Sequence, residues 1–174
     1  MREILRKSIH FVGLAYIPAY DLLGKEGMIV TVGILTAIAI LVEFLRQRYD
    51  FIPEFLLRDY EKESVGAYVY FGIAAFVITA FLPKKACFVG IVTGSLGDGV
   101  AGILKHHFRL GKNVSSLGML LSSSAMLGAI GLLSPESLTA VLAGTLAERI
   151  DRVNDNLSVP IVSAFIYRAL EIVL

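Results

Sequence analysis

The chain has 174 residues, of which 56% are hydrophobic and 18% are charged, and its formal net charge at pH 7 is +1. A typical soluble domain is about 45–50% apolar and about 25% charged, so this composition indicates a membrane protein. The small net charge argues against a general affinity for nucleic acid. The single cysteine excludes an intrachain disulfide and a CxxC metal motif. We expect one integral membrane domain over residues 1–174, in an oligomeric state that the sequence leaves open.

Seven apolar stretches follow one another along the chain, at about 8–23, 27–45, 65–82, 86–104, 114–133, 136–149 and 157–174. A membrane helix needs about 20 mostly apolar residues. The third and fifth stretches carry no charge, the fourth contains Asp98, and the last two are short or interrupted. Because backbone polar groups in lipid must be satisfied internally, we expect an all-α, polytopic membrane helix bundle with about seven transmembrane helices.

Positive residues set the expected orientation. If the N-terminus is cytoplasmic, most of the 16 Lys and Arg residues fall on the cytoplasmic side of these stretches, as the positive-inside rule requires. An odd number of crossings then leaves the C-terminus outside. Residues 46–64 form the longest polar stretch and are amphipathic, which is typical of a helix lying along the membrane surface. We therefore expect a multi-pass protein of the cell membrane.

Ionisable residues in or beside the predicted spans gather on the cytoplasmic side in this orientation. Such residues are costly in a membrane and usually have a function. From the N-terminus onwards they are Arg6, Lys7, His10, Glu43, Arg46, Glu63, Asp98, Lys105, Lys112, Glu148, Asp151 and Asp155, with Asn156 directly after the last. An active site, if the protein has one, is expected on that side and facing the cytoplasm.

These residues form two chemically complementary sets. Carboxylates with an asparagine suit a hard cation such as Mg²⁺, which usually also binds substrate phosphates. Arginine, lysine and histidine side chains, together with backbone N–H groups of glycines such as Gly97, suit phosphate oxygens. A phosphoryl-transfer site needs both sets. The sequence has neither a P-loop nor the loops of a protein kinase, so nucleotide chemistry would need another scaffold.

Each of these features also has a structural interpretation. Glycines at every fourth position around Asp98 are typical of closely packed membrane helices, although this does not explain Asp98 itself. Lys105 could serve only to set the topology. The acidic residues at 148–155 could form a solvated loop that pairs with Arg149 or Arg152.

Five short motifs occur in order along most of the chain: RKSIH at 6–10, EFLR at 43–46, ESVGAYVYF at 63–71, GDGVAG at 97–102 and DNLSVP at 155–160. Together they resemble the CTP-dependent lipid kinases, the group of dolichol kinase, phytol kinase and yeast-type diacylglycerol kinase, which is related to the phosphatidate cytidylyltransferases. One position and one segment differ from that pattern. Lys105 stands where the family has a glycine, and KNVSSL at 112–117 replaces the common KSxEGS.

The resemblance implies phosphoryl transfer from CTP to a membrane alcohol, with Mg²⁺ or another divalent cation. The alcohol could be dolichol or another polyprenol, geranylgeraniol, phytol or diacylglycerol. The implied roles are catalytic for Asp98, His10 and Glu148, metal-binding for Asp98 and Asp155, nucleotide- or phosphate-binding for Arg6, Lys7, Gly97, Lys105, Lys112 and Asn156, and supporting for Glu43, Arg46, Glu63 and Asp151.

Two other functions are open at this point, and the same residues could serve the first of them. In a cytidylyltransferase that forms a CDP-lipid, a lipid phosphate would attack the α-phosphate of CTP and pyrophosphate would leave. A non-catalytic transporter or membrane scaffold is the third possibility. Transporters often show inverted repeats and polar groups at the bilayer midplane, and neither is evident in this sequence.

Overall fold

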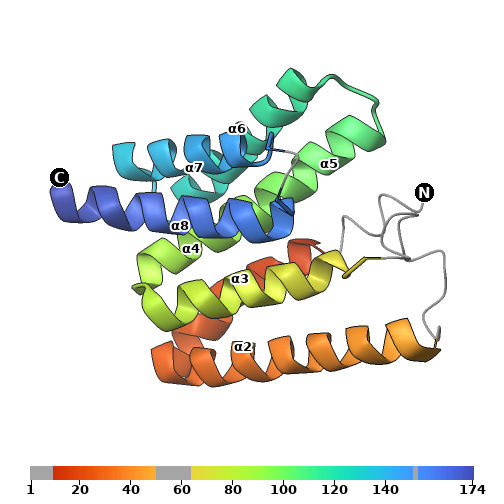
Figure 1. Cartoon of the computed structure of the whole chain (residues 1–174). Coiled ribbons are helices and arrows are strands. Elements are labelled where there is room, and N and C mark those ends of the chain that lie inside the picture. Colours follow the sequence, from red (N-terminus) through yellow and green to blue (C-terminus); the bar gives the residue numbers. More distant parts are fainter. Residues whose placement is uncertain (1–9, 50–63, 151–152) are drawn as a thin grey trace.

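The chain folds as a bundle of α-helices. A computed structural model describes residues 10–49, 64–150 and 153–174, and within these ranges it contains helices and no β-strand (Figure 1). The predicted all-α architecture is confirmed. The elements are η1 (Gly13–Ala15), α2 (Tyr16–Tyr49), α3 (Ala67–Phe81), α4 (Lys84–Val92), the π-helical turn η4 (Thr93–Gly97), α5 (Asp98–His106), α6 (Lys112–Ala129), α7 (Pro135–Ala147) and α8 (Asp155–Val173).

Gly24 divides the first long helix into two arms. The backbone is helical on both sides of this residue, but its φ of 67° and ψ of −177° are not, and glycine adopts such a φ without steric cost. A straight helix over the 40 residues from His10 to Tyr49 would be about 60 Å long, about twice the hydrocarbon thickness of a bilayer. The kink instead lets the second arm, 25–49, run back beside the first arm, 10–23 (Figure 1).

Three helical segments are long and apolar enough to cross a membrane: His10–Tyr49, Lys84–His106 and Asp155–Val173. The second of these combines α4, η4 and α5 into one continuous rod. Helix α3 is apolar but shorter. Length and composition therefore support a membrane location. The count of seven crossings and the side of the N-terminus stay predictions.

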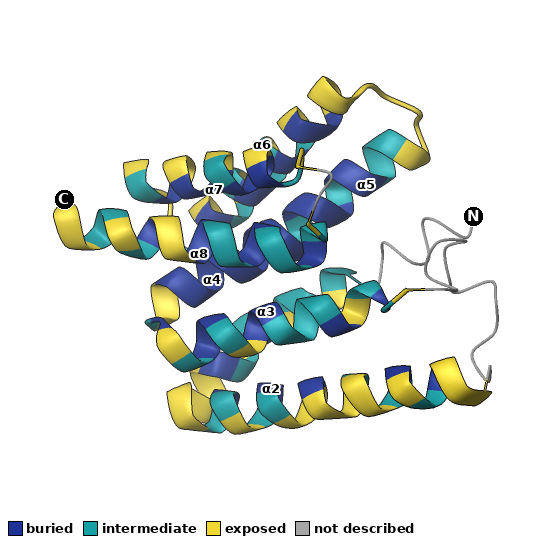
Figure 2. Ribbon diagram, in the orientation of Figure 1, coloured by how far each residue is buried: buried dark blue, intermediate teal, exposed yellow. Residues whose placement is uncertain are grey.

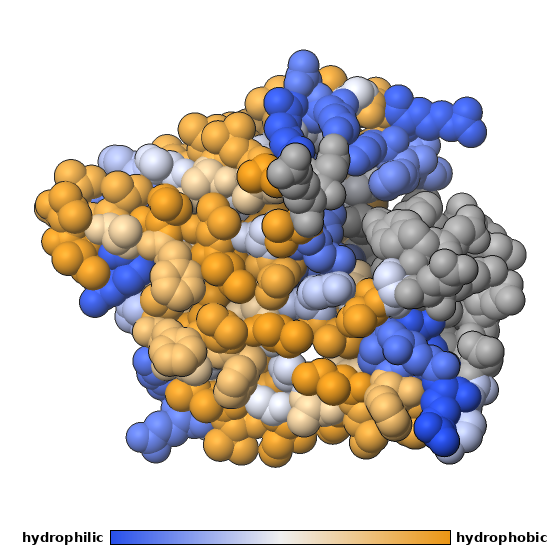
Figure 3. Space-filling view, in the orientation of Figure 1, coloured by the Kyte–Doolittle hydropathy of each residue, from blue (hydrophilic) through white to orange (hydrophobic). Residues whose placement is uncertain are grey.

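Much of the exposed surface of the bundle is apolar. The rod of α4, η4 and α5 lies at the centre and is mostly buried, whereas the second arm of α2 is largely exposed (Figure 2). The view in Figure 3 shows apolar side chains covering most of the helices on that face. Soluble monomers rarely expose large contiguous apolar patches, so this surface fits lipid better than water. The exposed apolar residues include Val30, Ile34, Leu41 and Phe44 of α2, Leu142 and Leu146 of α7, and Phe165 and Ile172 of α8.

The central rod packs closely against α8 because two of its residues lack a side chain. A Cβ atom at Gly90 would lie 2.6 Å from the carbonyl oxygen of Pro160, and one at Gly94 would overlap the Pro160 ring. The structural interpretation of the glycine stripe is thus confirmed at these two positions. Their packing aligns the segment that follows Gly94 with the segment that precedes Pro160, and the candidate site lies there.

A π-helical turn separates α4 from α5. It covers Thr93–Gly97 and ends directly before Asp98. A π turn closes i→i+5 hydrogen bonds, and such turns occur frequently at functional sites. Residues after the turn sit at a different angle around the rod from the one that an uninterrupted α-helix would give them. The turn therefore helps to set the direction in which Asp98 points.

The contact between Gly94 and Pro160 can be tested by adding one methyl group. We expect Gly94→Ala to destabilise the protein by about 1–3 kcal/mol, as overpacking does, although alanine has a higher helix propensity than glycine by about 1 kcal/mol. Gly111→Ala is the matched control, since a Cβ atom there meets nothing within 4 Å. Thermal unfolding in detergent should show a lower Tm for Gly94→Ala alone. Equal Tm values for the two variants would contradict the contact.

Candidate functional site

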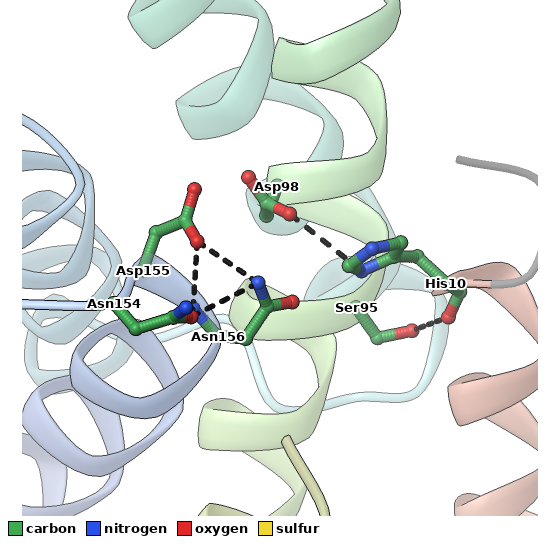
Figure 4. Close-up of polar contacts among 6 residues, drawn as sticks. All are labelled: His10, Ser95, Asp98, Asn154, Asp155 and Asn156. Carbon is green, nitrogen blue, oxygen red and sulfur yellow. Dashed lines mark hydrogen bonds and ion pairs between the residues drawn. The ribbon is translucent and has the colours of Figure 1, made fainter. Parts of the chain in front are cut away.

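Asp98 is the buried carboxylate at the centre of the candidate site. It is the first residue of α5 and only 3% exposed. One of its oxygens, Oδ2, lies 3.6 Å from Nδ1 of His10 (Figure 4). That separation is beyond a hydrogen bond but short enough for strong electrostatic attraction to a protonated imidazole. The predicted catalytic residues Asp98 and His10, far apart in the sequence, are therefore brought together.

The first arm is held against the central rod by contacts on either side of Asp98. The Ser95 hydroxyl donates a hydrogen bond to the backbone carbonyl of His10. The missing side chain of Gly99 makes room for Phe11, whose ring carbon would lie 2.9 Å from a Cβ atom at that glycine. His10 is thus positioned through its backbone as well as through its side chain.

Asp155 and Asn156 form the opposite wall of the site. They begin α8, and Asn154 caps that helix by accepting a hydrogen bond from the Asn156 backbone N–H at 3.0 Å. The Asn156 side-chain amide donates to Asp155 Oδ1 at 2.9 Å and to Asn154 Oδ1 at 3.2 Å. Asp155 and Asn156 lie across a gap from Asp98 and His10 (Figure 4). The two carboxylates that the sequence predicts as metal ligands therefore lie on opposite walls of one site.

One oxygen in this site is left without a partner. Asn156 is 5% exposed, and its Oδ1 is buried and has no hydrogen bond to any part of the chain that the structure describes. A buried polar atom without a partner costs about 1–3 kcal/mol. An acceptor in this condition beside two carboxylates has the chemistry of a cation ligand.

The donor set fits Mg²⁺ that is shared with a substrate, and it does not form a complete metal cage. Within residues 10–49, 64–150 and 153–174, no three His, Cys, Asp or Glu side chains are grouped closely enough to hold a metal ion. Mg²⁺ is usually bound by one or two carboxylates together with water and substrate phosphates. Asp98, Asp155 and Asn156 Oδ1 supply oxygen ligands of this kind.

The remaining predicted residues differ in their burial. Glu148 caps the C-terminus of α7 and is half-buried, as is Lys105 near the end of α5, whereas Lys112 is exposed at the start of α6. The bare α-carbon of Gly97 faces Ser123 of α6, so this glycine has a packing role. Four predicted site residues lie outside the described residues: Arg6, Lys7, Glu63 and Asp151.

Glu43 and Arg46 form a buried ion pair that connects the end of α2 to the start of α3. The Arg46 guanidinium donates to both Glu43 carboxylate oxygens, at 2.9 and 2.6 Å, and to the backbone carbonyl of Ser64 at 2.8 Å. The Tyr68 hydroxyl donates to Glu43 Oε2 at 2.5 Å. A bidentate Arg–carboxylate pair is geometrically specific, so it fixes the start of α3 against the end of α2. The resemblance implies supporting roles for Glu43 and Arg46, but nothing in the sequence indicated their contacts with Tyr68 and Ser64.

Arg149 makes a second connection that sequence reasoning missed. Its guanidinium donates to Ser116 Oγ at 3.1 Å and also to Asn113 Oδ1, and so links the end of α7 to the start of α6. Both acceptors belong to KNVSSL, the segment that departs from the lipid-kinase pattern. The residues in that segment thus serve a helix contact. An ion pair between the acidic residues at 148–155 and Arg149 or Arg152 stays a prediction, because Asp151 and Arg152 lie outside the described residues.

The chain has a relative among known proteins that matches it over nearly its full length. No protein-family model matches the chain, and no solved structure matches it. The chain is 32% identical over 180 aligned residues to the uncharacterized protein MJ1137 of Methanocaldococcus jannaschii, an alignment that covers 95% of this chain and 93% of the relative. Similarity at this level over nearly the full length of both chains shows common descent, and the chain belongs to the same protein family as MJ1137.

Proposed function

We propose that the protein is a CTP-dependent kinase that phosphorylates a membrane lipid alcohol at the cytoplasmic face. One observation carries the proposal: the buried Asp98–His10 pair lies across a gap from Asp155 and from the unpartnered Asn156 oxygen. Carboxylates of this kind, with a possible proton acceptor beside them, suit phosphoryl transfer better than they suit a structural role. The choice of CTP rests on the five motifs that resemble those of the CTP-dependent lipid kinases.

The carboxylates would hold the metal and nucleotide. Asp98, Asp155 and Asn156 Oδ1 would bind Mg²⁺ together with the nucleotide phosphates, and the ion would neutralise charge on the transferred group. Lys105 lies in the last turn of α5, and Lys112 is the first residue of α6, the next helix in the chain. The positive charge of both side chains would attract phosphate oxygens. Arg6 and Lys7 are proposed to add to this positive charge.

His10 would act on the lipid hydroxyl. Its Nδ1 lies 3.6 Å from Asp98 Oδ2, and the imidazole would accept the hydroxyl proton. Asp98 would then stabilise the positive charge that forms on the imidazole, as a carboxylate beside a histidine does in other general-base sites. Glu148 is the alternative proton acceptor, since it caps α7 near the same end of the bundle.

We propose a topology of seven crossings with the N-terminus in the cytoplasm. The seven predicted stretches each correspond to a helical stretch, with Gly24 separating the first two. Successive helices run in opposite directions (Figure 1), which puts the site and Lys105 at one end. An ion pair between Asp21 and Lys84 lies at the other end. The positive-inside bias supports the site end as the cytoplasmic one.

A cytidylyltransferase is the second candidate, and the KNVSSL segment keeps it open. Asn113 and Ser116 in this segment bind Arg149, so the segment offers different groups from those that the kinase pattern places beside the nucleotide. A kinase would release CDP and a lipid phosphate, whereas a cytidylyltransferase would release pyrophosphate and a CDP-lipid. A transporter or scaffold would turn over no nucleotide.

Asp98→Asn tests whether the buried carboxylate is catalytic. We expect purified protein with CTP, Mg²⁺ and a panel of lipid alcohols to form a lipid phosphate, and we expect Asp98→Asn to lower kcat by about 100-fold or more, as the loss of one key electrostatic group does. Asp21→Asn is the matched control, because Asp21 is half-exposed at the opposite end. Full activity in Asp98→Asn, with a Tm equal to that of the wild type, would exclude this site.

The Asn156 oxygen can be tested as a metal ligand without measuring turnover. We expect Asn156→Ala to weaken Mn²⁺ binding by about 10–100-fold, measured by electron paramagnetic resonance with a non-hydrolysable CTP analogue present. Ser163→Ala is the control, since Ser163 lies further along α8 and its buried hydroxyl also lacks a partner in the described ranges. If both variants bind Mn²⁺ as the wild type does, Asn156 is not a ligand.

A further inference from the structure

An apolar cavity of about 420 Å³ lies between the two arms of α2 and α3. The first arm contributes Val12 and Tyr16, the second arm Val32 and Thr36, and α3 contributes Phe71. Most of its lining is apolar. The hydroxyls of Thr36 and Tyr16 are already satisfied within the protein, since Thr36 donates to the Gly72 carbonyl at 3.0 Å and Tyr16 bonds with Thr79 Oγ1 at 2.8 Å. In a membrane, a space of this kind suits a hydrocarbon chain.

The cavity adjoins the candidate site. Gly13 lines the cavity, and a Cβ atom on it would lie 2.7 Å from the Ser95 hydroxyl oxygen. That hydroxyl donates to the carbonyl of His10, whose imidazole faces Asp98. On the central rod, Ile91 forms part of the cavity wall, and Ser95 and Asp98 follow within two turns. A molecule in the cavity therefore needs to extend past Gly13 and Ser95 to reach the candidate catalytic groups.

The dimensions of the cavity match one lipid chain. Along the second arm its lining runs from Met28 to Ala39, which is about 16 Å of α-helix. This is about half of the hydrocarbon thickness of a bilayer and so the depth of one leaflet. A cavity of about 150 Å³ accommodates one benzene molecule. By that scale 420 Å³ accommodates roughly 15–20 carbons, which is one chain and not two.

We propose that this cavity binds the single hydrocarbon chain of the lipid alcohol, with the hydroxyl directed past Ser95 to His10 and Asp98. The role of the hydroxyl rests on the proposed kinase function, whereas the location of the chain does not. A single-chain alcohol of about 15–20 carbons fills the cavity. A longer polyprenol would extend beyond it into lipid, and diacylglycerol would have to leave its second chain outside.

The location of the chain can be tested by crosslinking in the absence of nucleotide. Purified protein in phosphatidylcholine nanodiscs would be irradiated with a geranylgeraniol analogue that carries a diazirine near the middle of its chain, and labelled peptides would be mapped. We expect labels on cavity residues such as Thr36 and Phe71, and we expect unlabelled geranylgeraniol to compete more strongly than dioleoylglycerol. Labels spread over outward residues such as Leu142 and Phe165 would overturn the proposal.

Replacing either of two alanines with phenylalanine provides the second measurement. Ala39 lines the cavity, while Ala37 is exposed on the same arm and does not. We expect Ala39→Phe to reduce competable labelling about 10-fold and Ala37→Phe to leave it unchanged. Equal labelling in the two variants would overturn the proposal.

The crosslinking result and the kinase result separate two possible failures. Labelling inside the cavity without CTP-dependent phosphorylation of any alcohol supports the chain site and contradicts the proposed kinase. Phosphorylation with labelling elsewhere supports the kinase and contradicts the chain site.

Discussion

The contact between the central rod and α8 is the constraint on which the candidate site depends. Gly90 and Gly94 lack side chains where Pro160 approaches, so the two backbones come closer than any other residue type would permit. Asp98 follows Gly94 by one turn, and Asn156 precedes Pro160 by one turn. Close packing of helices therefore brings together two polar segments that are far apart in the sequence.

Burying the polar groups of the site in an apolar helix bundle costs free energy, and this cost indicates that they have a function. A helix contact alone would be satisfied by small apolar residues, as it is around Gly90. Instead Asp98 and Asn156 are almost fully buried, and one acceptor of Asn156 has no partner in the described part of the chain. Burial of this kind in an otherwise apolar bundle is expected where a ligand completes the site. The apolar cavity beside it gives the same region both polar and hydrocarbon binding surfaces.

Much of the fold followed from the sequence, because apolar runs broken by Gly, Pro and charged residues mark helices in a membrane protein. A shared site for His10 and Asp98 was implied by the resemblance to the lipid kinases, and close packing at the glycine stripe followed from its spacing. The π turn before Asp98 did not, since no residue pattern distinguishes it from an α-helical turn. The contacts of Arg149 with Ser116 and Asn113 were also missed, because they depend on how α6 and α7 pack. The cavity is a property of three packed segments and has no signature in any one of them.

Transfer of the γ-phosphate of CTP to a lipid alcohol is tested most directly by following two radiolabels. The protein would be incubated with Mg²⁺, each alcohol of the panel in turn, geranylgeraniol among them, and CTP labelled at either the γ- or the α-phosphorus, and the lipid fraction would be extracted. We expect label in the lipid from γ-labelled CTP and none from α-labelled CTP. Label in the lipid from α-labelled CTP, or none from either nucleotide across the panel of alcohols, would contradict it.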